Sequence, residues 1–246
     1  MSLVTYQSRD GIAEITLNRA EKYNVINHEI VEELHQAWVR FANSPEDRVA
    51  ILAAAGEKAF TAGANLRDIP HDLWRAIPGV GVQVNKPIIA VTTGLVIGGG
   101  LVLVQMADLA VAADNTVFSY PEAKVGFSGG LISSLAARIP HKVAMELLLV
   151  GGNLSAQRAY EVGLVNRVVP LGQQLETARE LAAQLAANAP LVLSLLKDFV
   201  GQVLPKGPTE QAAIARARVL EINASADFHE GISAFTEKRT PTFSGH

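Results

Sequence analysis

Short, predominantly apolar runs separated by helical segments are the feature that most constrains how this chain can fold. Residues 12–17 and 49–54 are apolar, partly β-branched and bounded by turn-forming residues, which is typical of buried strands. Between them, apolar residues recur at intervals of three and four from Ile30 to Phe41, and Asn27 stands just ahead of them as a helix cap. This order predicts a strand, a helix and a second strand.

The same order continues through the middle of the chain and changes toward its end. Residues 87–93 and 109–113 are two further candidates for buried strands, with a helical stretch at 98–107 between them. Strands that alternate with helices favour an α/β architecture. After residue 155 helices dominate. The expected helices cover 156–162, 175–187, 191–204, 210–225 and 228–238, with one short strand at 165–169.

Composition limits the classes of function that are open to the chain. With 246 residues, 49% of them hydrophobic, the chain can bury the core of one substantial domain. A net charge of −3 provides no overall field for DNA or for an anionic membrane. The absence of cysteine excludes disulfides and a thiol nucleophile. The N-terminus shows no signal peptide, and no apolar run approaches the roughly 20 residues of a membrane helix, so we expect a cytoplasmic protein.

Two glycine-rich stretches are the first candidates for chemistry. One surrounds Gly63 and the other is Gly98-Gly99-Gly100, and each is expected to follow a strand and to open a helix. Taken singly, either could serve only as a tight turn. As a pair, they could direct two backbone N–H groups at one point and form an oxyanion hole.

Glu122 is the candidate acid/base. It directly follows Pro121, and in isolation it could simply favour the start of a helix there. Glu122 becomes a candidate because it follows the two glycine-rich stretches in the chain.

Taken together, these segments resemble the crotonase (enoyl-CoA hydratase/isomerase) superfamily. The resemblance implies a spiral of repeated ββα units over residues 1–190. It also implies a C-terminal helical region over 191–246 that is used in oligomerisation, as a homotrimer or a hexamer. The segments similar to the family are 18–24, 59–68, 98–100, 121–122, 154–165 and 234–239.

The resemblance also implies roles for site residues. The N–H groups of Ala64 and Gly99 would hold a thioester carbonyl oxygen, and Glu122 would act as the acid/base. Val102 stands where the hydratases of this family carry their first catalytic glutamate. Hydration needs one group to deprotonate water and another to deliver a proton to the α-carbon, whereas a double-bond shift needs only one base. The sequence therefore favours an isomerase.

Coenzyme A is expected as part of the substrate, with no permanently bound cofactor and no metal. The segment between Ala64 and Gly99 is short for the family, so the acyl group stays undetermined. The residues that the resemblance places near coenzyme A are Lys22, Tyr23, Ala62, Asn65, Leu66, Arg67, Phe235 and Lys238.

Alternatives within the same family stay open at this point. His71, Asp72 or Tyr120 could supply a second acid/base and restore hydratase activity. A decarboxylase or hydrolase of CoA thioesters is another possibility, as is a non-catalytic binder of acyl-CoA or RNA.

A serine hydrolase is the alternative from a different class. Residues 126–130 match the Gly-x-Ser-x-Gly pattern around Ser128. Asp198 or Asp227 and then His229 follow in the chain order of an α/β-hydrolase. No core strand is expected directly before the pattern, which weighs against this class.

Overall fold

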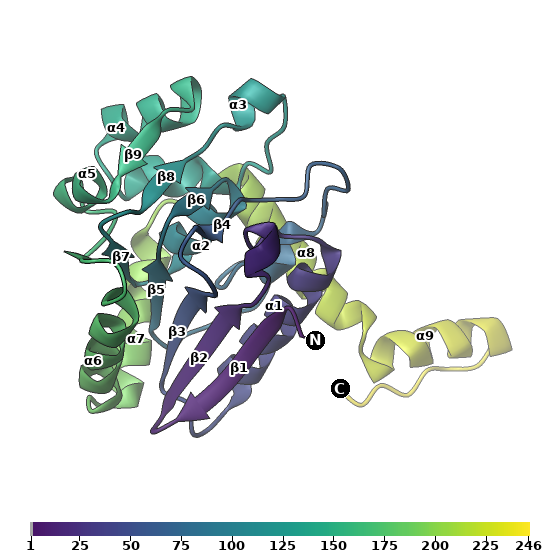
Figure 1. Cartoon of the computed structure of the whole chain (residues 1–246). Coiled ribbons are helices and arrows are strands. Elements are labelled where there is room, and N and C mark those ends of the chain that lie inside the picture. Colours follow the sequence, from purple (N-terminus) through teal and green to yellow (C-terminus); the bar gives the residue numbers. More distant parts are fainter. Residues whose placement is uncertain (1) are drawn as a thin grey trace.

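Ten strands within residues 2–246, the part of the chain described by the computed structural model, form two β-sheets (Figure 1). All neighbouring strands are parallel except the pairs β1–β2 and β8–β9. The larger sheet has the order β1 (Val4–Arg9), β2 (Ile12–Leu17), β3 (Val49–Ala54), β5 (Ile88–Thr92), β7 (Leu109–Ala113) and β10 (Arg167–Val169). The smaller sheet has the order β4 (Ala59–Thr61), β6 (Leu95–Ile97), β8 (Val117–Ser119) and β9 (Asn153–Ser155).

The chain passes from the larger sheet to the smaller one three times, through β3–β4, β5–β6 and β7–β8. Each pair is followed by a helical segment: a 3₁₀ helix at Leu73–Ala76, then α2 (Gly99–Met106), then α3 (Glu122–Val125). This is the expected spiral of ββα units. Because β4, β6 and β8 are parallel neighbours, the segments that leave their carboxyl ends emerge along one edge.

Helix α1 (His28–Asn43) covers one face of the larger sheet. It begins where the sequence predicts, because Asn27 Oδ1 accepts the Ile30 N–H at 3.0 Å. Its fully buried residues include Leu34 and Trp38, and the Trp38 indole donates to the Ala76 carbonyl at 2.9 Å. The apolar residues of the amphipathic pattern are therefore those that pack against the sheet.

Helix α6 (Gln174–Ala186) covers the opposite face (Figure 1). Its small residues Ala178 and Ala182 pack with Val49, Ile51 and Val111, which point away from α1. Burial on both faces explains why the central strands are apolar without alternation.

The C-terminal helices differ in how they meet this core. Helix α7 (Pro190–Val203) is fastened by Lys197, whose Nζ lies 2.7 Å from Asp108 Oδ2 and donates to the Lys86 carbonyl at 2.8 Å. Asp108 is therefore structural. Helix α9 (Ala226–Glu237) projects away from the body (Figure 1). The division at residues 190 and 191 stays a prediction.

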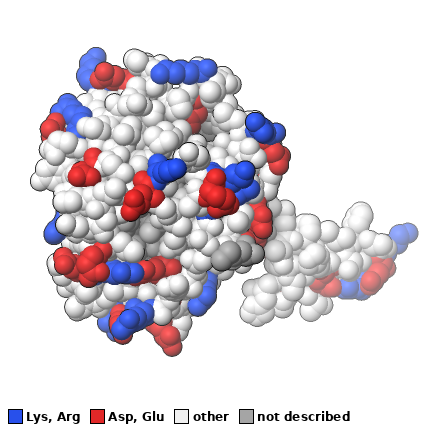
Figure 2. All heavy atoms as spheres, viewed as in Figure 1, with Lys and Arg blue, Asp and Glu red and all other residues white. Residues whose placement is uncertain are grey.

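Neither the helices nor the surface charge of the described chain marks out a membrane or polyanion partner by itself. No helix within residues 2–246 is both long enough and apolar enough to cross a membrane. Lysine and arginine side chains are interspersed with acidic ones on the face shown in Figure 2. The remaining helical segments are Ala20–Lys22 and Leu131–Ala137 (3₁₀), α4 (His141–Met145), Glu146–Val150 (π), α5 (Ala156–Glu161) and α8 (Pro208–Asn223).

One sequence expectation needs correction, and four strands had no predicted bounds. The stretch around Gly63 follows strand β4 but does not open a helix, since a turn and a loop continue to the 3₁₀ helix at Leu73–Ala76. The expected spiral implied further strands, including one ahead of each glycine-rich stretch, but the residue patterns gave no bounds for β4, β6, β8 or β9. These strands have three residues each, too few to show the alternation that marks a half-buried strand.

Candidate active site

A cavity of about 390 Å³ is lined by residues from the segments that follow β4, β6 and β8, together with helix α8. It brings together the three residues to which the sequence assigned catalytic roles, Ala64, Gly99 and Glu122. The other lining residues are Pro70, His71, Leu73, Trp74, Val102, Tyr120, Phe127, Ser128, Gly129, Leu131, Thr209, Ala212, Ala213 and Arg216.

The amide of Ala64 is a hydrogen-bond donor whose neighbours are both engaged. The Gly63 N–H donates to Thr61 Oγ1 at 3.0 Å, and the Asn65 N–H donates to the Ile26 carbonyl at 2.8 Å. Within residues 2–246, the intervening Ala64 N–H donates to no acceptor. The paired neighbours hold this free donor at the cavity wall.

The amide of Gly99 is free for a different reason. Gly99 is the first residue of α2, and N–H groups at a helix N-terminus lack an intrahelical acceptor. The preceding Gly98 N–H is held by the Ser119 carbonyl at 3.0 Å, which ties this turn to the end of β8. The helix dipole adds positive potential at the same point.

Glycine allows the two donor segments to touch. Gly63 has φ of +87°, and a β-carbon there would lie 3.1 Å from the Ile97 carbonyl oxygen. Larger residues would push the turn after β4 away from the turn after β6. The close approach of the two segments therefore rests on backbone contact.

Glu122 is the first residue of the short helix α3 and points into the cavity. Burial raises its pKa to about 7, and its Oε2 atom is buried with no hydrogen-bond partner among the described residues. Its Oε1 atom lies against the backbone of Gly98, where a β-carbon would come within 2.5 Å of it. Near neutral pH this carboxyl group can both accept and release a proton.

Val102 faces the same cavity and is 4% exposed. Across the described residues, Glu122 is the sole carboxylate in the lining. The position where a second acidic group would serve hydration is therefore apolar in the folded protein as well as in the sequence.

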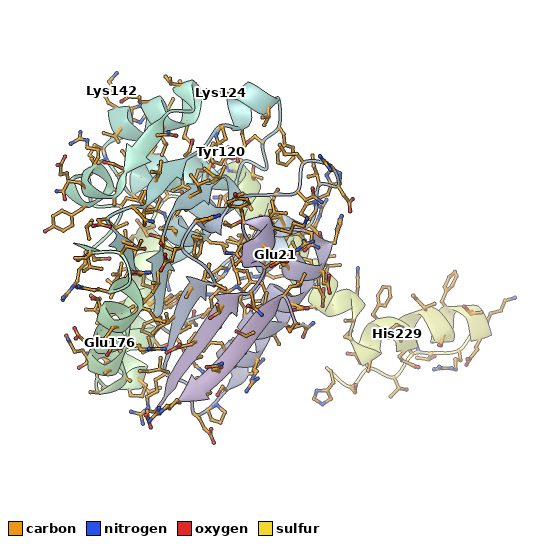
Figure 3. The ribbon with its side chains drawn as sticks, viewed as in Figure 1. Glu21, Tyr120, Lys124, Lys142, Glu176 and His229 are labelled. Atoms are coloured by element: carbon orange, nitrogen blue, oxygen red, sulfur yellow. The ribbon has the colours of Figure 1, made fainter. Side chains whose placement is uncertain are left out.

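Two of the three candidates for a second acid/base line the cavity. Tyr120, shown in Figure 3 within the body, places its hydroxyl 3.3 Å from Ser128 Oγ, and burial raises its pKa to about 12. His71 lies in the loop after β4. Asp72 is absent from the lining and belongs to a surface network instead.

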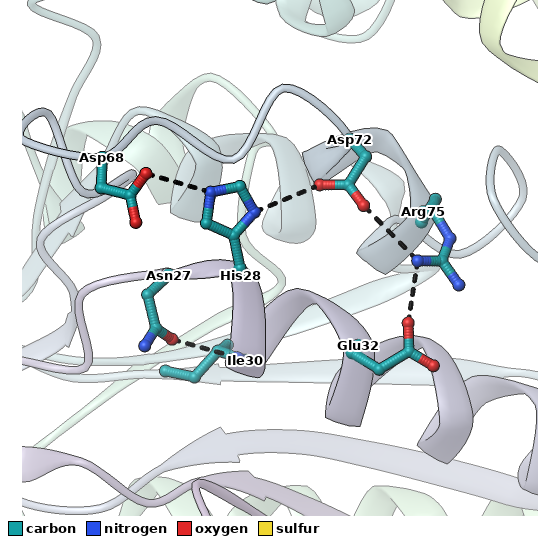
Figure 4. A network of polar contacts seen from close by, with 7 residues as sticks. All are labelled: Asn27, His28, Ile30, Glu32, Asp68, Asp72 and Arg75. Atoms are coloured by element: carbon teal, nitrogen blue, oxygen red, sulfur yellow. Dashed lines mark hydrogen bonds and ion pairs between the residues drawn. The ribbon is translucent and has the colours of Figure 1, made fainter.

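That network connects the loop after β4 to helix α1 (Figure 4). His28 Nε2 lies 3.3 Å from Asp68 Oδ1, and Arg75 Nη1 lies 2.8 Å from Glu32 Oε2 and 3.4 Å from Asp72 Oδ2. Since the 3₁₀ helix at the end of this loop contributes Leu73 and Trp74 to the cavity, these contacts hold one of its walls. His28 has a structural part in this arrangement.

Most of the residues assigned to coenzyme A lie on two adjoining segments. The Ala62 N–H donates to the Tyr23 carbonyl at 2.9 Å, which joins the segment of Lys22 and Tyr23 to that of Asn65, Leu66 and Arg67. Lys22, Tyr23, Leu66 and Arg67 are exposed.

Phe235 and Lys238 are not brought to this group within one chain. Phe235 lies on α9 with 87% of its surface exposed, and Lys238 caps the end of that helix. Helix α9 carries both residues away from the body (Figure 1).

Sequence reasoning missed the wall that helix α8 provides. Thr209, Ala213 and Arg216 follow at spacings of four and three, which place them on one helical face, and Ala212 adjoins them. This spacing was the available signal. Nothing local indicated that this helix turns toward the glycine-rich segments.

The serine-hydrolase arrangement does not form. Ser128 follows the short helix α3 rather than a strand, and its Oγ accepts the Gly130 N–H at 3.2 Å. Asp227 accepts backbone N–H groups of the C-terminal tail, and His229 sits on the projecting α9 (Figure 3). No triad is assembled around Ser128 in residues 2–246.

Comparison with known proteins gives consistent matches. A sequence model described as enoyl-CoA hydratase/isomerase matches residues 7–246. Carnitinyl-CoA dehydratase from Proteus mirabilis is 35% identical over 254 residues, which cover 97% of each protein. The protein of the same name from Escherichia coli O157:H7 is 36% identical over 262 residues, which cover 100% of both.

Solved structures agree in fold over the full length. Enoyl-CoA hydratase from Mycobacterium tuberculosis H37Rv and carnitinyl-CoA dehydratase from Mycobacterium avium 104 each have a TM-score of 0.77, 34% identity and complete coverage of both chains. Together with the match over residues 7–246, these likenesses show that the chain belongs to the enoyl-CoA hydratase/isomerase family, the crotonase superfamily that its sequence resembles.

Proposed function

We propose that this protein moves a double bond in an acyl-CoA thioester between the β,γ and α,β positions, with Glu122 as its single acid/base. The observation that carries the proposal is the composition of the cavity. It contains one buried carboxyl group with a pKa raised to about 7, two free backbone amides, and Val102 in place of a second carboxylate.

The proposed reaction needs no other group. The thioester oxygen accepts hydrogen bonds from the backbone N–H groups of Ala64 and Gly99, two residues that line the cavity. Ionised Glu122 takes a proton from the α-carbon of a β,γ-enoyl thioester, and the electron pair delocalises onto the thioester oxygen as a dienolate. Protonated Glu122 then returns the proton to the γ-carbon, and the double bond lies between the α- and β-carbons. The amides stabilise the negative charge at the stage where it is greatest.

Coenzyme A would lie along the segments of Lys22, Tyr23, Ala62 and 65–67. Arg67 and Lys22 are exposed cations that can meet its phosphates. Because α9 leads away from the body, Phe235 and Lys238 could reach a bound coenzyme A only from a neighbouring subunit. This assignment thus depends on the proposed homotrimer or hexamer.

Addition or removal of water is the second candidate, and two observations favour it. Curated relatives are named carnitinyl-CoA dehydratase. In addition, Tyr120 and His71 line the cavity together with Glu122, so either could handle the second proton that hydration requires.

Paired turnover of crotonyl-CoA and 3-enoyl-CoA separates the two candidates. The conjugated thioester is followed spectroscopically, with wild type beside Glu122→Gln. We expect isomerisation without hydration, a kcat/KM that rises with pH through about 7, and a loss of about 100-fold or more in the variant. Ser128→Ala, which removes a lining hydroxyl without a charge, is the control and should retain most activity.

Other outcomes point elsewhere. Hydration of crotonyl-CoA at a comparable rate would contradict the single-base mechanism, and loss of that activity in Tyr120→Phe or His71→Gln would identify the second group. Inactivity on both substrates would direct attention to a decarboxylase, a hydrolase or a binder. We further propose the cytoplasm as the location of the protein.

A further inference from the structure

Arg216 introduces a permanent positive charge into a cavity that is otherwise mostly apolar. Leu73, Trp74, Phe127 and Leu131 supply hydrophobic surface, and α8 adds small alanines beside Arg216. A guanidinium group stays charged throughout the physiological pH range and offers five N–H donors in a planar fork. The site therefore contains a strong anion-recognising group that the proposed proton transfer does not use.

Arg216 is also free to bind a ligand. The residues three and four positions away on α8 are Ala212, Ala213, Val219 and Leu220, so its own helix offers no acidic partner. In residues 2–246, no carboxylate lies within ion-pairing distance of Arg216, and its side chain makes no hydrogen bond there.

Four other arginines of the chain are closely paired, whereas Arg67, Arg167 and Arg218, like Arg216, form no ion pair within residues 2–246. Arg75, Arg158, Arg179 and Arg239 each contact a carboxylate at 2.9 Å or less. Arg216 is exposed and unpaired, and it differs from the other unpaired arginines in lining the cavity, so its charge is available to an anionic group that enters there.

We infer that the substrate is an acyl-CoA thioester whose acyl chain ends in a carboxylate, and that Arg216 binds this carboxylate. The inference rests on the proposed function only in so far as the cavity binds an acyl-CoA thioester. The planar fork of arginine matches a carboxylate through two parallel hydrogen bonds. The apolar residues beside it accommodate the methylene groups that separate the carboxylate from the thioester.

The charge of Arg216 argues against an acyl group that ends in a trimethylammonium cation, such as the carnitinyl group in the names of the relatives. Two cations in one small cavity repel each other, and the aromatic side chains of Trp74 and Phe127 would have to outweigh that repulsion. Arg216 is thus a specificity-determining residue that separates this chain from a protein for a cationic acyl chain.

Three saturated thioesters test the inference, because they have the same chain length and differ only in the end group. Glutaryl-CoA ends in a carboxylate, 5-methylhexanoyl-CoA in a neutral isopropyl group, and 4-(trimethylammonio)butanoyl-CoA in a cation. None contains the double bond of the proposed reaction, so binding is measured by calorimetry independently of turnover. We expect wild type to bind glutaryl-CoA about tenfold or more tightly than the other two.

Variants of α8 identify the residue responsible. In Arg216→Gln, we expect the affinity for glutaryl-CoA to fall about tenfold while the affinity for the neutral thioester changes by less than about threefold. Arg216→Lys should retain part of the preference, since it keeps the charge and loses the fork. Arg218→Gln, on the same helix but outside the cavity lining, should bind all three as wild type does.

Each contrary result has a distinct meaning. Equal weakening of all three thioesters in Arg216→Gln would overturn the inference and assign the arginine to the coenzyme A phosphates or to folding. Wild-type binding of all three without preference would overturn it too, while the proposed function would stand. Failure of wild type to bind any of them would overturn both proposals. Loss of isomerisation in the turnover experiment, with the preference for glutaryl-CoA intact, would overturn only the proposed reaction.

Discussion

At the scale of single residues, Glu122 illustrates how a functional position opposes stability. Burial raises its pKa to about 7, because the cavity wall removes water from the carboxyl group, and its Oε2 atom has no hydrogen-bond partner among residues 2–246. The folded protein therefore binds this proton more tightly than the unfolded chain does. The ionised form, which is the base in the proposed reaction, is the form that destabilises the fold.

The pH dependence of stability follows from this difference. In wild type, the cost of ionising Glu122 is absent below the ordinary carboxyl pKa of 4.5, grows as the pH rises toward about 7, and is complete above that value. Glu122→Gln carries no such cost. We compare the unfolding free energy of the variant with that of wild type at each pH. As the pH rises from 5 to 8, we expect this difference to shift by about 1–2 kcal/mol in favour of the variant, after allowance for solvent screening.

Urea denaturation at the two pH values measures this gain. Ser128→Ala alters the same cavity without removing a group that titrates in this range, so its difference from wild type should be the same at both pH values. A constant difference for Glu122→Gln as well would show that the carboxyl group is not desolvated in the folded state.

At the scale of elements, the turn between β6 and α2 joins two functions. Gly98 has φ of +54°, and its α-carbon faces Glu122 Oε1, while the next amide is the proposed oxyanion donor. The turn thus sets both the position of the proposed base and the start of the helix whose dipole favours negative charge.

Gly98→Ala should damage activity more than stability. An added β-carbon would come within 2.5 Å of Glu122 Oε1 and displace the carboxyl group, in addition to straining the backbone. Gly163→Ala is the matched control, because Gly163 has φ of +80° and open space around a β-carbon. We expect both variants to lose about 1–2 kcal/mol of stability.

Only Gly98→Ala should lose most of its kcat, by about 100-fold. Thermal unfolding and turnover of 3-enoyl-CoA measure the two effects. Equal activity in the two variants would mean that Glu122 does not depend on the shape of this turn.

At the scale of the whole molecule, the C-terminal helices expose an apolar surface that a single chain leaves uncovered. Every residue of α7 is at least partly exposed, including Leu196, Phe199 and Val203, and on α9 Phe235 is 87% exposed. Large exposed apolar patches usually mark contacts with other chains. This surface supports the proposed homotrimer or hexamer.

Sedimentation velocity tests the assembly. We expect wild type to sediment as a trimer or hexamer and the double variant Leu196→Asp/Phe199→Asp to sediment as a monomer, because two carboxylates in a buried interface cost several kcal/mol. Gln184→Asp, an exposed change on the neighbouring α6, should leave the assembly intact. A monomeric wild type would refute this proposal and the contribution of Phe235 and Lys238 to coenzyme A.

The sequence by itself determined the parts of this protein that depend on local pattern. Strands β2 and β3 have the predicted bounds and α1 starts at its predicted cap, because periodicity and side-chain capping act within a few residues. The order of the glycine-rich segments and Glu122 likewise indicated the family, and Val102 in place of an acidic residue predicted a site with one carboxylate.

Only the tertiary structure decided what distant segments do to one another. The three-residue strands β4, β6 and β8 exist because they pair, and their pairing brings Ala64, Gly99 and Glu122 to one cavity. The raised pKa of Glu122 depends on which surfaces exclude water from its carboxyl group. The position of Arg216 in the cavity lining depends on how helix α8 packs against the segments after β4, β6 and β8. These are properties of contacts between segments, and no local pattern contains them.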